Sequence, residues 1–127
     1  MSMRSDWVAA KAAAKRVNNN TAVKFPKDLK LGDLLDKMET AEKAYKKAGE
    51  KELNKAWAKA ADAYFASVLA AEKAALGYHQ ALPHMQINDV ARSELDTHLT
   101  YHIMNKTTAA IRDRDRLAAK IARLRNS

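Results

Sequence analysis

The sequence contains no cysteine, and it has only 3 glycines and 2 prolines among its 127 residues. Without cysteine there is no disulfide framework, no thiolate metal site and no cysteine nucleophile. Because glycine and proline are the main helix breakers, their scarcity predicts long uninterrupted helices. No apolar run approaches the roughly 18–20 residues that span a bilayer. We therefore expect no membrane span, and a cytoplasmic location.

What the chain has in place of these residues is alanine. Alanine, the residue of highest helix propensity, occupies 26 of the 127 positions. Valine, isoleucine and threonine together number 15, too few to build a sheet. Hydrophobic residues make up 47% of the chain, which excludes disorder by composition. The composition predicts an all-α fold, an elongated bundle of three long helices plus a short N-terminal helix, forming a single domain over residues 1–127.

Apolar periodicity and helix-capping residues place the helices along the chain. The predicted ranges are 5–17 for the short basic helix, and 33–48, 50–82 and 88–125 for the main helices. Ser5 or Asp6 is predicted to cap the first helix, and the polar run from Asn18 to Thr21 to end it. Phe25-Pro26 then predicts an extended loop, because proline pushes the preceding residue out of the helical region.

The second and third helices are predicted to form an antiparallel hairpin, since few residues separate them. Gly49 is expected to end the second helix as a left-handed C-cap, and Pro83 to stop the third. The last helix is expected to start at a cap on Asn88 or Asp89. Residues 105–108 have poor helix propensity and predict a kink or break.

On a helical wheel, one face of the last helix is apolar and the opposite face carries a narrow polar stripe. The stripe predicts a partner-binding surface made of His98, His102, Asn105, Arg112, Arg116, Lys120 and Arg123. Its positive charge can meet an acidic protein surface, or it can follow a nucleic-acid backbone through phosphate contacts without reading bases. Asp113 and Asp115 neutralise part of its field. A solvated face that only keeps the protein soluble is the third interpretation.

The spacing Glu94-x3-His98-x3-His102 also matches that of helical zinc ligands. A catalytic zinc needs a further strong ligand and a general base, and Leu99 stands where the base of an HExxH motif would lie. We therefore predict neither a metal nor another cofactor, although the sequence leaves metal binding at these three residues open.

The net charge of +8 is uneven along the chain. Residues 1–30 carry 7 Lys/Arg against 2 Asp/Glu, and residues 112–127 carry 6 against 2, whereas the residues between them are close to neutral. The N-terminal cations would join the stripe in one patch if the two ends of the chain lay together. They are Lys11, Lys15, Arg16, Lys24, Lys27 and Lys30.

No phosphate-binding loop, nucleophile elbow or kinase-like set of motifs is present. We therefore predict a non-enzymatic interaction protein, such as an inhibitor, immunity protein, adaptor or assembly subunit, that binds an acidic macromolecular partner through the stripe. Nucleic-acid binding is the alternative. Because alanine removes little apolar area from water, a homodimer is also expected to supply missing burial.

Overall fold

The computed structural model describes residues 2–25 and 30–127, and every regular element of these residues is helical. The α-helices are α1 (Met3–Val17), α2 (Leu31–Gly49), α3 (Lys55–Ala81), α4 (Asp89–Thr97) and α5 (Asn105–Arg125). A 3-10 turn, η1 (Leu82–His84), follows α3, and a π-helical segment, η2 (His98–Met104), joins α4 to α5. The predicted all-α bundle is confirmed.

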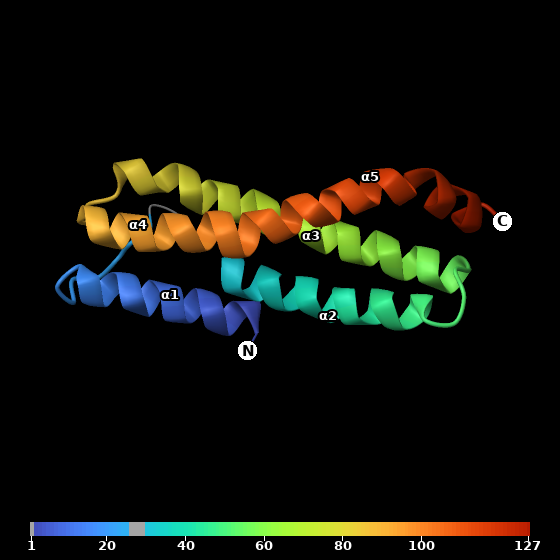
Figure 1. Cartoon of the computed structure of the whole chain (residues 1–127), viewed down its shortest axis with the longest axis horizontal. Coiled ribbons are helices and arrows are strands. Elements are labelled where there is room, and N and C mark those ends of the chain that lie inside the picture. Colours follow the sequence, from blue (N-terminus) through green and yellow to red (C-terminus); the bar gives the residue numbers. More distant parts are fainter. Residues whose placement is uncertain (1, 26–29) are drawn as a thin grey trace.

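The elements form a rod of three rows (Figure 1). Helix α3 is one row, α4, η2 and α5 together are the second, and α1 and α2 lie end to end in the third. Helices α1 and α2 both start near the middle of the rod and run in opposite directions, so the N-terminus lies near the middle and the C-terminus at one end. Helices α2 and α3 form the predicted antiparallel hairpin.

Helix α1 begins earlier than predicted and ends as predicted. Ser2 caps it, because its Oγ accepts a hydrogen bond from the backbone N–H of Ser5 at 3.0 Å. The prediction that Ser5 or Asp6 is the cap was wrong, since both residues already lie inside the helix. Asn19 and Asn20 follow the helix with φ of 60° each, a left-handed conformation that asparagine tolerates better than most residues.

The predicted C-cap role of Gly49 was wrong. No described glycine has a positive φ, and Gly49 is instead the last residue of α2, beneath an indole ring. A Cβ at this position would lie 3.0 Å from Cδ1 of Trp57, so glycine makes room for that ring. The third helix also starts later than residue 50, at Lys55, because Asn54 caps it through a 3.1 Å bond from the N–H of Trp57.

At its other end, α3 continues through Gly77 to Ala81, and Pro83 lies in the turn that follows. Asn88 caps α4 as predicted, accepting a bond from the N–H of Ala91 at 2.8 Å. The same residue also ties α4 to α1. Its backbone N–H donates to Oδ1 of Asn18 at 2.9 Å, so the end of α1 is fixed beside the start of α4.

Opposite charges meet where α1 and α2 begin. The backbone N–H of Met3 donates to Oε1 of Glu39 at 2.5 Å, and Nη1 of Arg4 lies 3.0 Å from Asp36 and 3.6 Å from Asp33. Helix N-termini carry partial positive charge, so these carboxylates stabilise the meeting of two such ends.

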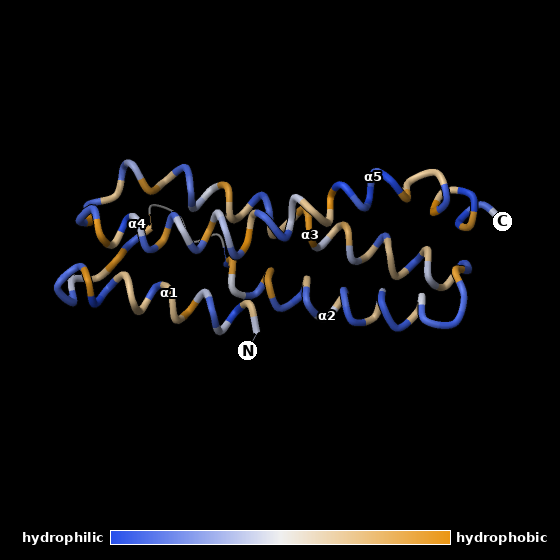
Figure 2. The backbone as a smooth tube through the Cα atoms, viewed as in Figure 1, coloured by the Kyte–Doolittle hydropathy of each residue, from blue (hydrophilic) through white to orange (hydrophobic). Residues whose placement is uncertain are grey.

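The core runs the length of the rod along α3. Trp57, Tyr64, Phe65 and Tyr78 of α3 supply four aromatic side chains to it, and Trp7 of α1 adds an indole that is 1% exposed. Figure 2 shows hydrophobic positions recurring along every row, with hydrophilic stretches between them.

Candidate functional site

The predicted polar stripe lies on a helix that changes its winding part of the way along. Segment η2 is π-helical, with i→i+5 hydrogen bonds in place of the α-helical i→i+4 pattern. The irregularity therefore lies just before residues 105–108, where the kink or break was predicted, and α5 begins as a regular α-helix at Asn105. Such segments are rare and frequently accompany functional sites.

The spacing of buried residues explains the π-helix. Positions 91, 95, 99, 103 and 107 are all buried, at intervals of four, whereas the core positions 110, 117, 121 and 124 follow at intervals of three, seven, four and three, as an α-helix requires. Repeated steps of four drift by about 40° each around an α-helix of 3.6 residues per turn. The wider π turn absorbs this drift and keeps one face toward the core. His98 and His102 lie within η2, and the arginines of the stripe follow it on α5. The π turn therefore rotates the arginines relative to the histidines, by about a quarter turn from the positions that an ideal helical wheel gives them.

His98 belongs to the edge of the core. It is half-buried, its ring centroid lies 5.8 Å from that of Trp7, and it stacks on His102 at 4.9 Å. Burial lowers the pKa of His98, the neighbouring His102 lowers it further, and Asp6 opposes the shift. The structure thus brings His98 and His102 together but directs His98 at α1, while His102 and Asn105 remain exposed.

The described residues contain no group of three His, Cys, Asp or Glu side chains placed to hold a metal ion. Glu94 is exposed and does not join the two stacked histidines in such a group. Nε2 of His79, on α3, lies 2.7 Å from Oδ1 of Asp96 on α4, a contact that ties two rows of the bundle together.

The cations of the stripe lie on α5 with few carboxylate partners. Arg112 and Arg123 are exposed, Lys120 is half-buried, and no described acidic residue forms an ion pair with any of the three. Arg116 pairs with Asp113 at 3.3 Å, one turn earlier on the same helix. The arginines are therefore not folded back into the interior.

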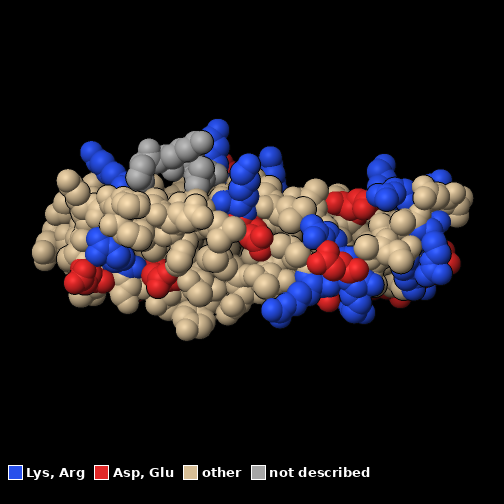
Figure 3. All heavy atoms as spheres, turned by 90° about the horizontal axis from the view of Figure 1, so that it is seen from above, with Lys and Arg blue, Asp and Glu red and all other residues tan. Residues whose placement is uncertain are grey.

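The tertiary structure places further cations in the same half of the rod as α5. The end of α2, the loop after it and the start of α3 lie in that half, and they carry Lys43, Lys46, Lys47, Lys51, Lys55 and Lys59. We call residues 40–66 and 106–127 the basic half. It carries 13 Lys/Arg against 6 Asp/Glu, a net +7, while the other described residues carry 9 against 8, a net +1. Figure 3 shows lysine and arginine gathering toward this end, with acidic groups between them.

The cations of α1 do not join this surface. Helix α1 runs toward the end of the rod opposite to the C-terminus, which carries Lys15 and Arg16 away from α5 (Figure 1). Lys11 lies over the Trp7 ring, with Nζ 5.5 Å from its centroid, in a cation–π contact. Pro26 of the predicted loop and Lys27 of the predicted patch lie outside the described residues.

One residue that sequence reasoning missed, Glu42, joins all three rows of the basic half. Its Oε1 accepts a hydrogen bond from Nζ of Lys106 at 3.1 Å, its Oε2 accepts one from the hydroxyl of Tyr64 at 3.1 Å, and Lys46 lies 3.8 Å away. Burial pushes the pKa of Glu42 upward, but Lys106, Tyr64 and Lys46 together hold it below the ordinary value. Burial also raises the pKa of Tyr64, and the charge of Glu42 adds to this.

In the sequence, Glu42 looks like one more acidic residue of a mixed-charge helix. No local pattern distinguishes it from its neighbours, because the groups that surround it come from positions 22 and 64 residues away along the chain.

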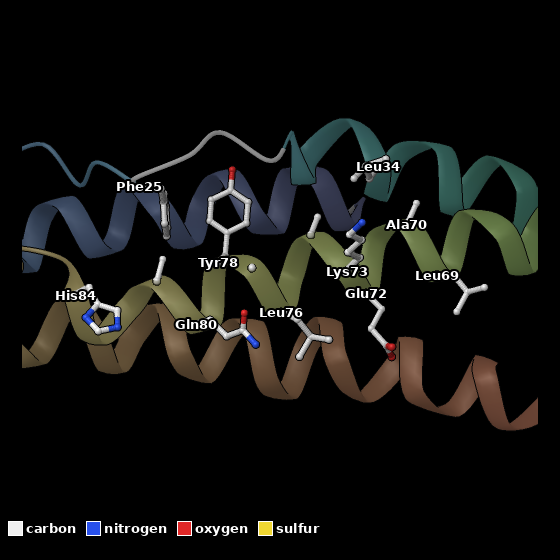
Figure 4. A pocket seen from close by; sticks show the side chains of 13 residues that line it. Phe25, Leu34, Leu69, Ala70, Glu72, Lys73, Leu76, Tyr78, Gln80 and His84 are labelled. Carbon is white, nitrogen blue, oxygen red and sulfur yellow. The ribbon is translucent and has the colours of Figure 1, made fainter.

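A groove of about 1060 Å³ lies over the outward face of α3, away from the stripe. Its apolar lining includes Leu69 and Leu76 of α3, Leu34 of α2 and Phe25, and Lys73 and Glu72 lie within it (Figure 4).

Comparison of the chain with protein-family models, with curated protein sequences and with solved structures gave no match. Among the described residues, no helix combines the length and the apolar character that crossing a bilayer requires.

Proposed function

We propose that this chain is a non-enzymatic interaction protein whose basic half binds an acidic surface of a protein partner. The contact is centred on the cations of α5: Arg112, Arg116, Lys120 and Arg123. The exposed His102 and Asn105 lie at the edge of this surface, and His98 supports it from the core.

The observation that carries the proposal is the concentration of charge in one half of the rod. That half holds +7 of the net +8, and its cations come from all three rows. Arg112, Lys120 and Arg123 have no acidic partner among the described residues, so their charge remains available. A surface with a net positive charge of this kind speeds encounter with an oppositely charged partner and fixes its orientation.

The acidic residues among these cations favour a protein partner over a nucleic acid. Asp113 and Asp115 are exposed on α5, and Glu50 and Glu52 are exposed between α2 and α3. Carboxylates at the contact surface repel a phosphate backbone, whereas a protein partner can present basic groups at matching points.

The test is affinity capture from the source cell with two variants of equal charge. One variant changes Arg112, Arg116, Lys120 and Arg123 to Gln, and the control changes Lys15, Arg16, Lys24 and Lys37, all outside the basic half, to Gln. We expect the same acidic protein to be captured by the wild type and the control, with or without nuclease, and to be lost from the first variant. Capture that the first variant retains contradicts the proposal.

Binding to nucleic acid is the alternative outcome of the same experiment. In that case nuclease abolishes capture, and a labelled duplex binds the purified protein with a log Kd that rises steeply with salt, by nearly one unit of slope per phosphate contact.

A further inference from the structure

A groove lies on the outside of the basic half, between α3 and α5, which run side by side (Figure 1). It consists of two adjoining hollows of about 400 Å³ and 290 Å³, which share Asp62 and Arg125 in their linings. Asp62 lies roughly opposite Trp57 and Tyr64 around α3, and those two aromatic side chains contact Tyr45 of α2. The groove is therefore on the side of α3 that α2 leaves uncovered.

The two walls of the groove have the spacing with which one helix packs on another. On α3, Asp62, Ala66 and Leu69 line it at intervals of four and three, and Ala118 and Ile121 line it on α5 at an interval of three. Such positions form one line along a helix, and a third helix can pack between two lines of this kind. At about 1.5 Å per residue, the wall from position 55 to position 69 is about 21 Å long, close to four helical turns.

The middle of the groove is apolar and its walls are built from small side chains. Phe65 and Ile121 form the floor, and each is 4% exposed. Ala66 and Ala118 are exposed on the two walls, and Leu69 is 42% exposed at one end. Because alanine projects only a methyl group, the backbone of another helix can approach closely here.

Both rims of the groove carry cations. Lys55 and Lys59 line it on α3, and Arg114 and Arg125 line it on α5. Neither lysine forms an ion pair with a carboxylate among the described residues, and Nζ of Lys55 donates to the backbone carbonyl of Ser127 at 3.1 Å.

Acidic residues offset part of this charge. Asp62 lies 3.2 Å from Arg125, and Asp115 lies 2.8 Å from Arg114. Two lysines and two arginines against these two carboxylates leave a net charge of +2 around the groove. The charge that remains unpaired is mainly on the lysines of the α3 rim.

We propose that this groove binds an amphipathic helix of a partner protein, one whose apolar face is flanked by aspartate and glutamate. The apolar face covers Ala66, Leu69 and Ala118, while carboxylates on its two flanks reach the lysines of α3 and the arginines of α5. Helices commonly dock in grooves by an apolar face, and charges that flank such a face select the partner. Two copies of the groove repel each other face to face, because both of its rims have the same sign.

This surface is separate from the stripe of the proposed function. At roughly 100° per residue, Arg116 and Arg123 lie about 160° around α5 from Ala118 and Arg125. A helix in the groove therefore does not contact the stripe, and the inference does not rest on the proposed function.

Two fluorescent helical peptides of about 18 residues, roughly five turns, probe the groove. Both have the same apolar line of leucine and alanine, and the flanking positions are glutamate in one peptide and lysine in the other. Fluorescence anisotropy measures the binding of each peptide to the full chain. We expect the glutamate peptide to bind and the lysine peptide not to bind.

Two double variants of equal charge then locate the binding. Ala66→Glu with Ala118→Glu places a carboxylate on each wall of the groove, and the control, Ala63→Glu with Ala119→Glu, places carboxylates on the same two helices outside it. All four alanines are exposed, so both variants should keep the fold, which circular dichroism verifies. We expect the groove variant to raise the Kd of the glutamate peptide by about tenfold or more, and the control by less than about threefold.

Three results overturn the proposal. In the first, the glutamate peptide binds no more tightly than the lysine peptide. In the second, the groove variant weakens binding no more than the control, which means that net charge alone attracts the peptide. In the third, sedimentation equilibrium shows the wild type as an oligomer of the 14.1 kDa chain that the groove variant dissociates, which makes a second copy the occupant.

Discussion

Oε1 of Glu42 on α2 accepts a hydrogen bond from Nζ of Lys106 on α5 at 3.1 Å, across positions 64 residues apart in the chain. Only 19% of the Glu42 side chain is exposed, and its second oxygen accepts the hydroxyl of Tyr64. This carboxylate is therefore the point at which the three rows of the basic half are tied together.

Replacing Glu42 by Ala should lower the free energy of unfolding by about 1 to 3 kcal/mol, because it leaves the buried Tyr64 hydroxyl and a partly buried ammonium without their acceptor. Urea denaturation measures the change. Glu50→Ala is the matched control, since Glu50 is exposed at the end of α2, and its effect should stay within about 0.5 kcal/mol. Equal effects from the two variants would refute the role given to Glu42.

His98 should make the stability of the fold depend on pH. Its pKa is lowered in the folded state by burial and by His102, with Asp6 opposing, so the unfolded chain binds more protons as the pH falls from the ordinary value of 6.5. The stability that the neutral ring provides is full above that pH and is lost as the pH falls through the folded-state pKa.

We expect His98→Phe, which keeps an aromatic ring against Trp7 but cannot titrate, to flatten this pH dependence. Thermal denaturation followed by circular dichroism across mildly acidic to neutral pH measures it. The same slope in the wild type and the variant would show that another group is responsible.

Trp7→Ala should cost about 3 to 5 kcal/mol, since this indole is 1% exposed and contacts the rings of Phe25, Tyr78 and His98. Hydrogen exchange should show α1 losing protection first, because Trp7 is the largest buried side chain that this helix contributes. Val8→Ala is the control. Val8 is 52% exposed on the same helix, and its loss should change stability by about 0.5 kcal/mol or less.

Deleting Tyr101 should convert η2 into a regular α-helix without loss of the fold. Tyr101 is 67% exposed, and its removal changes the interval between the buried Leu99 and Ile103 from four to three, which restores the α-helical alternation. Deleting the exposed Ala109 should instead rotate the rest of α5, from Ala110 onward, by roughly 100° and strongly destabilise the bundle.

Circular dichroism and thermal denaturation compare the two deletions. If both are equally damaging, the π-helix is not the means by which the core accommodates its four-residue spacing.

Helix class and most helix positions could be read from the sequence, because they depend on local quantities. Alanine content and apolar periodicity predict helices, and a cap such as Asn88 acts within one turn of its own position. The π-helix also had a local signal, the repeated interval of four from Ala91 to Thr107, although a wheel with a fixed angle per residue could not represent it. Gly49 misled for a different reason: its role depends on a tertiary contact, with the Trp57 ring of the next helix.

The sequence by itself determined that this is a basic, helical protein with an organised row of cations on its last helix. Only the tertiary structure decided that α2 and α3 bring their lysines to the same end as α5, that the cations of α1 lie elsewhere, and that His98 packs against α1. Those outcomes depend on which helices become neighbours. Which helices pack together depends on how their complete apolar faces can be buried, and no short stretch of the sequence determines that.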